Sequence, residues 1–455
     1  MSSARLQQPK GMYVLAFTEL FERLSYYTFS FLLVLYAAAP VVKGGLGWKE
    51  ADALNLMGTY TFAAFSLPIL GGFFADRILG VFRAAIMGAV LIVIGHCCMY
   101  FSSANSIGYL YLALSLVSLG TAFFKPSMPT LLGLLYGPND SRRASGFSYY
   151  YVGINLGAMI AGILAGVMMS AWGYRIALAS AGVTMIIGVV ILLIGRKHLV
   201  ILPPAGLIHT GAPASRHAVK PLSPVLKKAL LYLFLAFAFF GVWSFIYNIG
   251  ISGTLSLYIE EYTDRTILGY TIPTPFFQSL ESLGIIIFTP LLTWYLGRRA
   301  LRGKEVHFFT QMNMALFIIS IGIAYLAYIS KEAASHIVPG ETPFIYYQMI
   351  GFILSISLSE IMISPVMMAA ISILSPLRFS AIMQAFYLLV IGVTGKLAGY
   401  VGGYSLQDPF TVFLTVAAIS TVAAVIFYLL RQKMMDIADA AALEQLEEEG
   451  EEVRA

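Results

Sequence analysis

Long apolar stretches, separated by short clusters of charged residues, prolines and glycines, follow one another along nearly the whole chain. Each stretch holds about 18 or more mostly apolar residues, the length that an α-helix needs to cross a bilayer. The pattern predicts twelve membrane-spanning helices, at about residues 12–39, 52–75, 84–101, 108–136, 146–171, 176–195, 228–256, 274–296, 307–330, 343–373, 380–403 and 408–431. Continuous runs such as Ala181 to Ile194 lack the alternation that a membrane β-strand would require.

The composition agrees with this pattern. The chain has 455 residues, of which 59% are hydrophobic and only 11% charged, and this predicts an all-α polytopic membrane protein. The net charge of +5 reflects basic loops and gives no reason to expect a nucleic-acid partner. Cys97 and Cys98 are adjacent and support neither a disulfide framework nor a metal site. We find no nucleophile, metal or nucleotide motif of an enzyme, and expect no cofactor.

Basic residues are distributed unequally between alternate loops. Of the 28 Lys and Arg residues, 20 fall in the two termini and the even-numbered loops, and five in the odd-numbered loops. Because basic loops stay in the cytoplasm, this predicts a multi-pass protein of the cell membrane with both termini cytoplasmic. The three remaining cations, Arg23, Lys125 and Lys396, lie inside predicted helices.

A proline-rich basic segment divides the predicted helices into two sets of six. We expect an N-terminal bundle at residues 1–195, a cytoplasmic linker at 196–227, a C-terminal bundle at 228–435 and an acidic cytoplasmic tail at 436–455. Two six-helix bundles around a site at the membrane midplane are the architecture of the major facilitator transporters.

Three charges stand inside the first predicted helix. Glu19, Glu22 and Arg23 share one helical face with Tyr26, Tyr27 and Ser30. Each charge costs about 2.5–3.5 kcal/mol at a helix centre, so this face is expected to meet water or another helix. Snorkelling to the membrane surface is the alternative.

Several motifs resemble those of known transporters. Asp76 and Arg77 lie within the stretch GGFFADRILG at 71–80, which resembles the loop between helices 2 and 3 of the major facilitator superfamily and implies that the two residues have a gating role. Three further motifs resemble those of the proton-dependent oligopeptide transporter (POT) family: ELFERLSYY at 19–27, FFKP at 123–126 and SEIMISP at 359–365. The segment from Phe147 to Ala158 also resembles the family's fifth helix.

The resemblance implies that helices 1, 4, 7 and 10 line a central cavity. Glu19, Glu22, Arg23 and Lys125 would then form a mutually neutralising set, in which a proton taken by Glu22 or Glu19 frees Arg23 or Lys125 to bind a carboxylate. A static ion-pair network is the alternative. Glu360 would face these cations and bind an amino group.

Further residues are expected to contact a peptide. Besides Arg23, Lys125 and Glu360, those expected to line the site are Tyr26, Tyr27, Asn155, Asn248, Gln278, Glu281 and Phe386, although Asn155 could instead bridge two helices. Aromatic side chains would supply apolar walls with polar edges for varied substrates.

The chain departs from the family at a gate. Ser30 stands where many members have arginine, and Tyr247 and Asn248 follow Trp243 where members have an acid and glutamine. Glu281 and Lys396 appear instead, and their similar depth predicts a pair within the C-terminal bundle that acts as a gate. The alternatives are that Glu281 and Lys396 each face water separately, or that Glu281 is a second amino-group anchor or proton site.

We therefore interpret the chain as a proton-coupled symporter that imports di- and tripeptides by alternating access, driven by the proton gradient and expected to be a monomer. Related symport of nitrate, amino acids or drug-like solutes, or a non-transporting nutrient sensor, are the other functions left open.

Overall fold

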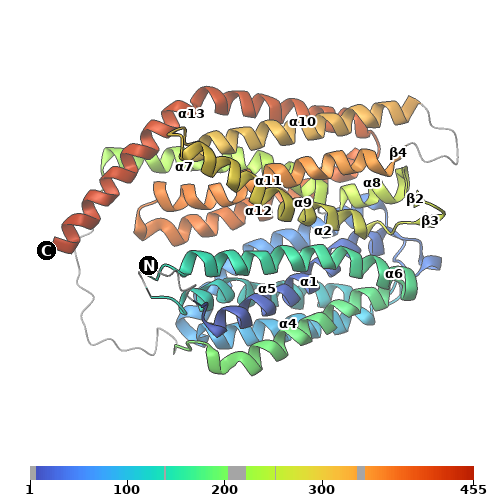
Figure 1. Cartoon of the computed structure of the whole chain (residues 1–455). Coiled ribbons are helices and arrows are strands. Elements are labelled where there is room, and N and C mark those ends of the chain that lie inside the picture. Colours follow the sequence, from blue (N-terminus) through green and yellow to red (C-terminus); the bar gives the residue numbers. More distant parts are fainter. Residues whose placement is uncertain (1–6, 138–139, 203–221, 252, 336–343, 455) are drawn as a thin grey trace.

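The computed structural model describes residues 7–137, 140–202, 222–251, 253–335 and 344–454. Long helices running roughly side by side make up almost all of this part of the chain (Figure 1). The helices are α1 (Lys10–Ala38), α2 (Glu50–Ser66), α3 (Pro68–Phe74), α4 (Val81–Tyr100), α5 (Gly108–Gly133), α6 (Arg143–Gly195), α7 (Pro224–Ile251), α8 (Thr254–Tyr262), α9 (Pro275–Ala300), α10 (Phe308–Ser335), α11 (Tyr346–Leu374), α12 (Leu377–Ser405) and α13 (Pro409–Arg454). Three short turns of 3-10 or π helix are η1 (Val41–Lys43), η2 (Ala75–Leu79) and η3 (Arg196–His198).

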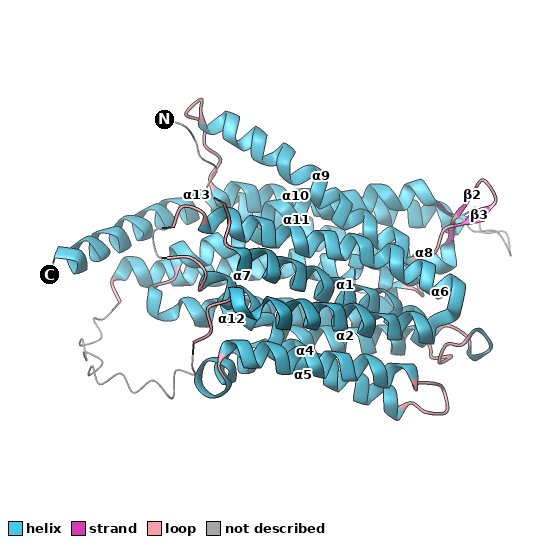
Figure 2. Ribbon diagram, turned by 60° about the horizontal axis from the view of Figure 1, so that its bottom comes forward, coloured by secondary structure: helices cyan, strands magenta, loops and turns pink. Residues whose placement is uncertain are grey.

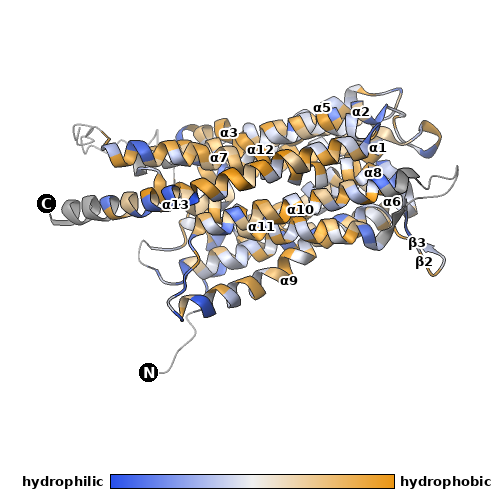
Figure 3. Cartoon of the chain, turned by 90° about the horizontal axis from the view of Figure 1, so that it is seen from above, coloured by the Kyte–Doolittle hydropathy of each residue, from blue (hydrophilic) through white to orange (hydrophobic). Residues whose placement is uncertain are grey.

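The helices form two groups that lie against each other, α1–α6 and α7–α13, here called the N-half and the C-half (Figure 1). The start of α1 and the end of α13 lie at one end of the molecule, and the short strands at the other (Figures 1 and 2). Hydrophobic residues cover the helices along their length, while hydrophilic residues gather at the two ends (Figure 3). This distribution is the one that a bilayer imposes on a spanning bundle.

Within the described residues, ten helices are long and apolar enough to cross a membrane. The helix α1 is not among them, and it is the one that carries Glu19, Glu22 and Arg23. The predicted spans 146–171 and 176–195 both fall on α6, which reverses direction near Gly173 (Figure 1). Gly173 has a φ of 78°, a conformation that glycine adopts without steric cost. Each predicted span overlaps a helix, although the helices do not separate into twelve elements.

Glycines bring the two halves into close contact along α2 and α12. A Cβ atom at Gly58 would lie 3.0 Å from the Gly395 carbonyl oxygen and 3.2 Å from the Gly399 Cα atom. Gly395, Gly399 and Gly403 follow each other at intervals of four residues on one face of α12. Such small-residue spacing lets two membrane helices approach to backbone contact. On the other side of the molecule, α6 of the N-half packs on α9 of the C-half.

Several boundaries differ from the sequence prediction. The stretch from Gly71 to Leu79 is not a loop: α3 and the π-turn η2 keep it helical, and the chain turns at Gly80, which has a φ of 79°. The predicted span 228–256 breaks near Gly253, where α8 begins. Four two-residue strands, which the hydrophobic pattern did not predict, connect helices at the end opposite the termini: β1 (Thr263–Asp264), β2 (Thr266–Ile267), β3 (Tyr270–Thr271) and β4 (Phe344–Ile345). They pair as β1 with β4, parallel, and β2 with β3, antiparallel.

The predicted acidic tail continues α13 as helix through Arg454. Of the predicted linker, residues 203–221 lie outside the described part of the chain.

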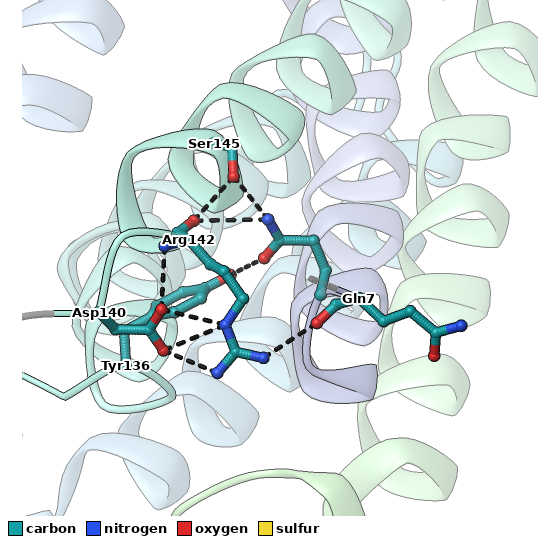
Figure 4. A network of polar contacts seen from close by, with 6 residues as sticks. Gln7, Tyr136, Asp140, Arg142 and Ser145 are labelled. Carbon is teal, nitrogen blue, oxygen red and sulfur yellow. Dashed lines mark hydrogen bonds and ion pairs between the residues drawn. The ribbon is translucent and has the colours of Figure 1, made fainter. Parts of the chain in front are cut away.

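The loop after α5 holds the segment that leads into α1 (Figure 4). Arg142 forms a two-pronged ion pair with Asp140, at 3.0 Å from Nε and 2.7 Å from Nη2, and its Nη1 donates to the Gln7 carbonyl at 2.9 Å. The Tyr136 hydroxyl donates to Gln8 Oε1 at 2.9 Å. Hydrogen bonds from the side chain and backbone of Arg142 lower the pKa of the Asp140 carboxyl to about 2. We call this network the N-terminal clamp.

Candidate functional site

The three charges of α1 lie together and are buried. Arg23 Nε forms an ion pair with Glu19 Oε1 at 3.2 Å and a shorter one with Glu22 Oε2. Their exposed fractions are 5% for Glu19, 1% for Glu22 and 6% for Arg23. The three side chains therefore do not extend to the membrane surface, because they form ion pairs with one another inside the protein.

Arg23 is only partly satisfied. Both carboxylates contact its Nε, while its Nη2 is buried and has no hydrogen-bond partner within the described residues. Nε and Nη2 belong to the same edge of the guanidinium group, which can bind a carboxylate through two parallel hydrogen bonds. The arrangement thus leaves half of a carboxylate-binding edge open.

Glycines of α6 let α1 sit deeply against both of its arms. A Cβ atom at Gly157 would lie 2.5 Å from the Leu20 carbonyl and 3.0 Å from Arg23 Cβ. On the returning arm, a Cβ at Gly188 would lie 3.4 Å from the Thr18 carbonyl. The residue pattern of α6 thereby fixes the position of the charged turn of α1.

Lys125 on α5 belongs to the same electrostatic cluster. It interacts through space with Arg23, Glu22 and Glu19, and its ammonium group lies 3.4 Å from the ring centroid of Phe65. A cation over an aromatic face is stabilised by the ring quadrupole where water is excluded. The structure thus brings together the four residues expected to form a mutually neutralising set.

Glu281 and Glu360 face each other in the C-half. The two carboxyl groups, on α9 and α11, lie within hydrogen-bonding reach of each other. Ser282 donates to Glu281 Oε2 at 3.0 Å, and the Ser357 hydroxyl donates to the Glu281 carbonyl at 2.9 Å. We call Glu281 and Glu360 the acid pair.

The predicted pair of Glu281 with Lys396 is wrong. Lys396 Nζ instead donates to Asn55 Oδ1 at 2.5 Å and to Thr59 Oγ1 at 2.6 Å, both on α2 of the N-half. Equal depth in the membrane permitted a pair, but depth does not report which face of a helix a residue occupies. Lys396 points to the seam between α12 and α2, and Glu281 points to Glu360.

Tyrosines lie between the two charged groups of residues. Tyr27 interacts electrostatically with Arg23 on one side and with Glu281 and Glu360 on the other. The Arg23 guanidinium lies 5.0 Å from the ring centroid of Tyr26. Tyr27 is thus in electrostatic contact both with the α1 cluster, which holds Arg23, and with the acid pair.

The remaining predicted contacts occupy varied positions. The Asn155 amide donates to the Tyr151 carbonyl at 3.0 Å, that of Asn248 to the Ser244 carbonyl at 2.7 Å, and that of Gln278 to Ser256 Oγ at 2.8 Å. The ring of Phe386 packs edge-on against Phe237 of α7 at 4.9 Å. All four side chains therefore have partners within the protein.

Asp76 and Arg77 do not bridge helix ends in this structure. Among the described residues neither takes part in an ion pair, and the Arg77 guanidinium lies 4.6 Å from the ring centroid of Phe73. The helical turn η2, which replaces the predicted loop, places Arg77 one turn from Phe73.

Sequence reasoning missed two features near the site. His96 on α4 is fully buried, and its Nε2 lies 3.1 Å from Ser25 Oγ on α1. A cavity of about 600 Å³ between α2 and α5 is lined by Asn55, Thr59 and Tyr60, among others. A lone histidine in an apolar stretch gives little signal, and the cavity depends on packing alone. None of the predicted substrate contacts lines this cavity.

The paired helical halves, with opposed buried poles between them, define a membrane transporter of the major facilitator fold. In structure the chain is similar to the peptide transporter POT in complex with sulfate, with a TM-score of 0.84, 24% identity and coverage of 95% of this chain and 96% of that one. A model of the POT family matches residues 82–211 and 217–429, so the chain belongs to the POT family. The predicted family and fold class are confirmed.

Two curated relatives extend this similarity. The chain is 26% identical over 469 residues to the peptide transporter YePEPT of Yersinia enterocolitica, with 90% of each chain covered. It is 34% identical over 233 residues to the di-/tripeptide transporter of Lactococcus lactis, a match that covers 50% of this chain and 46% of that one.

Proposed function

We propose that this protein is a proton-coupled symporter that imports di- and tripeptides across the cell membrane by alternating access. Membership in the POT family and the similarity to two peptide transporters support a peptide as the substrate. The single observation that carries the proposal is that Tyr27 interacts both with Arg23 of the α1 cluster and with Glu281 and Glu360 of the acid pair. A zwitterion with separated carboxylate and amino groups matches this polarity.

Proton coupling is assigned to the charged turn of α1. A proton on Glu22 or Glu19 would remove one of the two carboxylates that hold Arg23 Nε. The edge formed by Nε and the unpartnered Nη2 would then accept the substrate carboxylate through two hydrogen bonds. Protonation and substrate binding would thus favour each other, which is the thermodynamic requirement for symport.

The close contacts between the halves support the alternating part of the cycle. They lie along α2 and α12 and between α6 and α9, where Gly166 meets Phe276 near the strand-bearing end of the molecule. If the termini are cytoplasmic, as the basic loops predict, this closed end faces outward. Transport then requires these two seams to separate while the opposite end closes.

Uptake into proteoliposomes with an imposed inward proton gradient tests the proposal. We expect a labelled dipeptide to accumulate with the gradient and not without it, and unlabelled di- and tripeptides to compete. Competition by nitrate or single amino acids alone would contradict the peptide assignment. Binding of dipeptide without accumulation under any gradient would favour a sensor.

A further inference from the structure

The acid pair brings two carboxyl groups of like charge together in the interior of the described structure. Glu281 is 7% exposed, and one carboxyl oxygen of each residue, Glu281 Oε1 and Glu360 Oε2, is buried without a hydrogen-bond donor among the described residues. Gly284, one turn after Glu281, lets α9 approach Ser357 of α11, where a Cβ would lie 2.5 Å from the serine hydroxyl. This close approach holds the two carboxyl groups together.

No cation neutralises the pair in the described part of the chain. Neither carboxylate takes part in an ion pair with lysine, arginine or histidine there. The titratable groups that face the pair from the packed helices are all tyrosines: Tyr27 on α1, Tyr151 on α6, Tyr247 on α7 and Tyr387 on α12. Lys396 of α12 is held at the seam with α2 instead.

Two neighbouring carboxylates in a buried site cannot both be ionised cheaply. A proton placed between them would supply the donor that both unpartnered oxygens lack, and would reduce the buried charge from two to one. The same two oxygens suit an ammonium group, which has three donors and would bridge them.

We propose that Glu281 and Glu360 hold one proton between them in the empty transporter and exchange it for the ammonium group of the substrate. The exchange conserves charge: the protonated pair carries one negative charge, and the ionised pair with a bound ammonium group also carries one. The displaced proton leaves to water, no covalent bond changes, and the pair acts as a proton site separate from the α1 cluster. Because the empty transporter carries this proton back outward, net symport requires the two carboxyl groups of the α1 cluster, Glu19 and Glu22, to carry more than one proton inward with each substrate.

This inference rests on the proposed function only in taking the substrate to carry an amino group. Its consequence is an opposing pH dependence at the two poles. A lower pH favours the carboxylate end, where a proton frees Arg23, and disfavours the amino end, where a proton must leave. Dipeptide affinity should therefore pass through a maximum with pH.

Isothermal titration of the purified protein with alanylalanine, in buffers of different ionisation enthalpy, counts the protons exchanged on binding. Near the affinity maximum of the unmodified protein we expect the variant Glu19→Gln with Glu22→Gln, in which the α1 cluster has no carboxyl group left to take up a proton, to release up to about one proton per dipeptide bound. Adding Glu281→Gln to this variant should leave binding through Glu360 and abolish the release. Adding Glu305→Gln, a carboxyl outside the site, should leave the release unchanged.

Release that persists without Glu281 would overturn the inference, as would binding to the variant Glu19→Gln with Glu22→Gln with no release at any pH from about 5 to 8. If the Glu281 variants fail to fold, infrared difference spectra of the unmodified protein, recorded with and without dipeptide, test the inference instead. A protonated-carboxyl band that disappears on adding dipeptide is expected, and no such band would contradict the pair. If uptake into proteoliposomes does not depend on a proton gradient, the proposed function fails and this inference does not. The two can be distinguished because proton release is measured at equilibrium, without a gradient.

Discussion

The ammonium group of Lys396, in the C-half, lies 2.5 Å from the amide oxygen of Asn55, in the N-half. The contact joins the two halves beside the glycine seam of α2 and α12. The hydrogen bond between Lys396 and Asn55 must therefore break whenever this seam opens.

Removing this contact should favour the opening of the seam. A hydrogen bond to a charged group contributes about 1.5–3 kcal/mol, so Lys396→Met should shift the balance away from the closed seam roughly tenfold or more. Spin-label distances between α2 and α12 would measure the populations. Asn55→Ala should act in the same direction, and the double variant should add little to either change. Fully additive effects would contradict a direct pair.

Glu22→Gln should uncouple transport from the proton gradient. The neutral amide cannot take up the proton, and Arg23 Nε keeps only Glu19 as its anionic partner. We expect uptake driven by an imposed gradient to fall to the level seen without one, while exchange of internal for external dipeptide continues. Glu305→Gln is a control outside the membrane helices. Gradient-driven accumulation at the normal rate would remove Glu22 from the coupling mechanism.

Gly399→Ala should destabilise the protein. The added methyl group would meet the Leu54 carbonyl and would lie 3.0 Å from Gly58 Cα, and such overpacking costs about 1–3 kcal/mol. Thermal unfolding in detergent should show a lower midpoint. Gly297→Ala on α9 is a matched control, because no atom lies within 4 Å of its added methyl group. An equal midpoint in both variants would indicate that the seam is not tightly packed.

The N-terminal clamp should weaken only in strong acid. The pKa of Asp140 is about 2 in the folded protein, below its value of about 3.9 in an unfolded chain. Its contribution to stability is thus fully present above about pH 4 and is lost as the pH falls through about 2. The difference in unfolding midpoint between the unmodified protein and Asp140→Asn should be constant from pH 7 to about 4 and vanish near pH 2. A difference that disappears by pH 5 would contradict the clamp; Asp52→Asn is a control without an ion pair.

The sequence predicted the family, the fold class and the grouping of the α1 charges with Lys125, because buried charges in an apolar helix require partners and the motif spacing was intact. It did not predict how Glu281 and Lys396 pair. Depth along a helix can be counted from the sequence, whereas the direction of a side chain depends on how each helix is rotated in the bundle. Asp76 and Arg77 illustrate a second limit of prediction from sequence. Their glycine-rich stretch has the composition of a loop, but in the structure it continues as helix.

The single-residue turn of α6 at Gly173 leaves no slack between its two arms. Gly157 on the first arm and Gly188 on the second both press against the turn of α1 that holds Glu22 and Arg23. The hairpin therefore carries that turn as a rigid cradle, and the charged residues cannot slide past α6 during a cycle. Movement between the halves must therefore occur where α6 meets α9 and where α2 meets α12. The proton-sensitive turn of α1 then moves as a rigid body with the rest of the N-half.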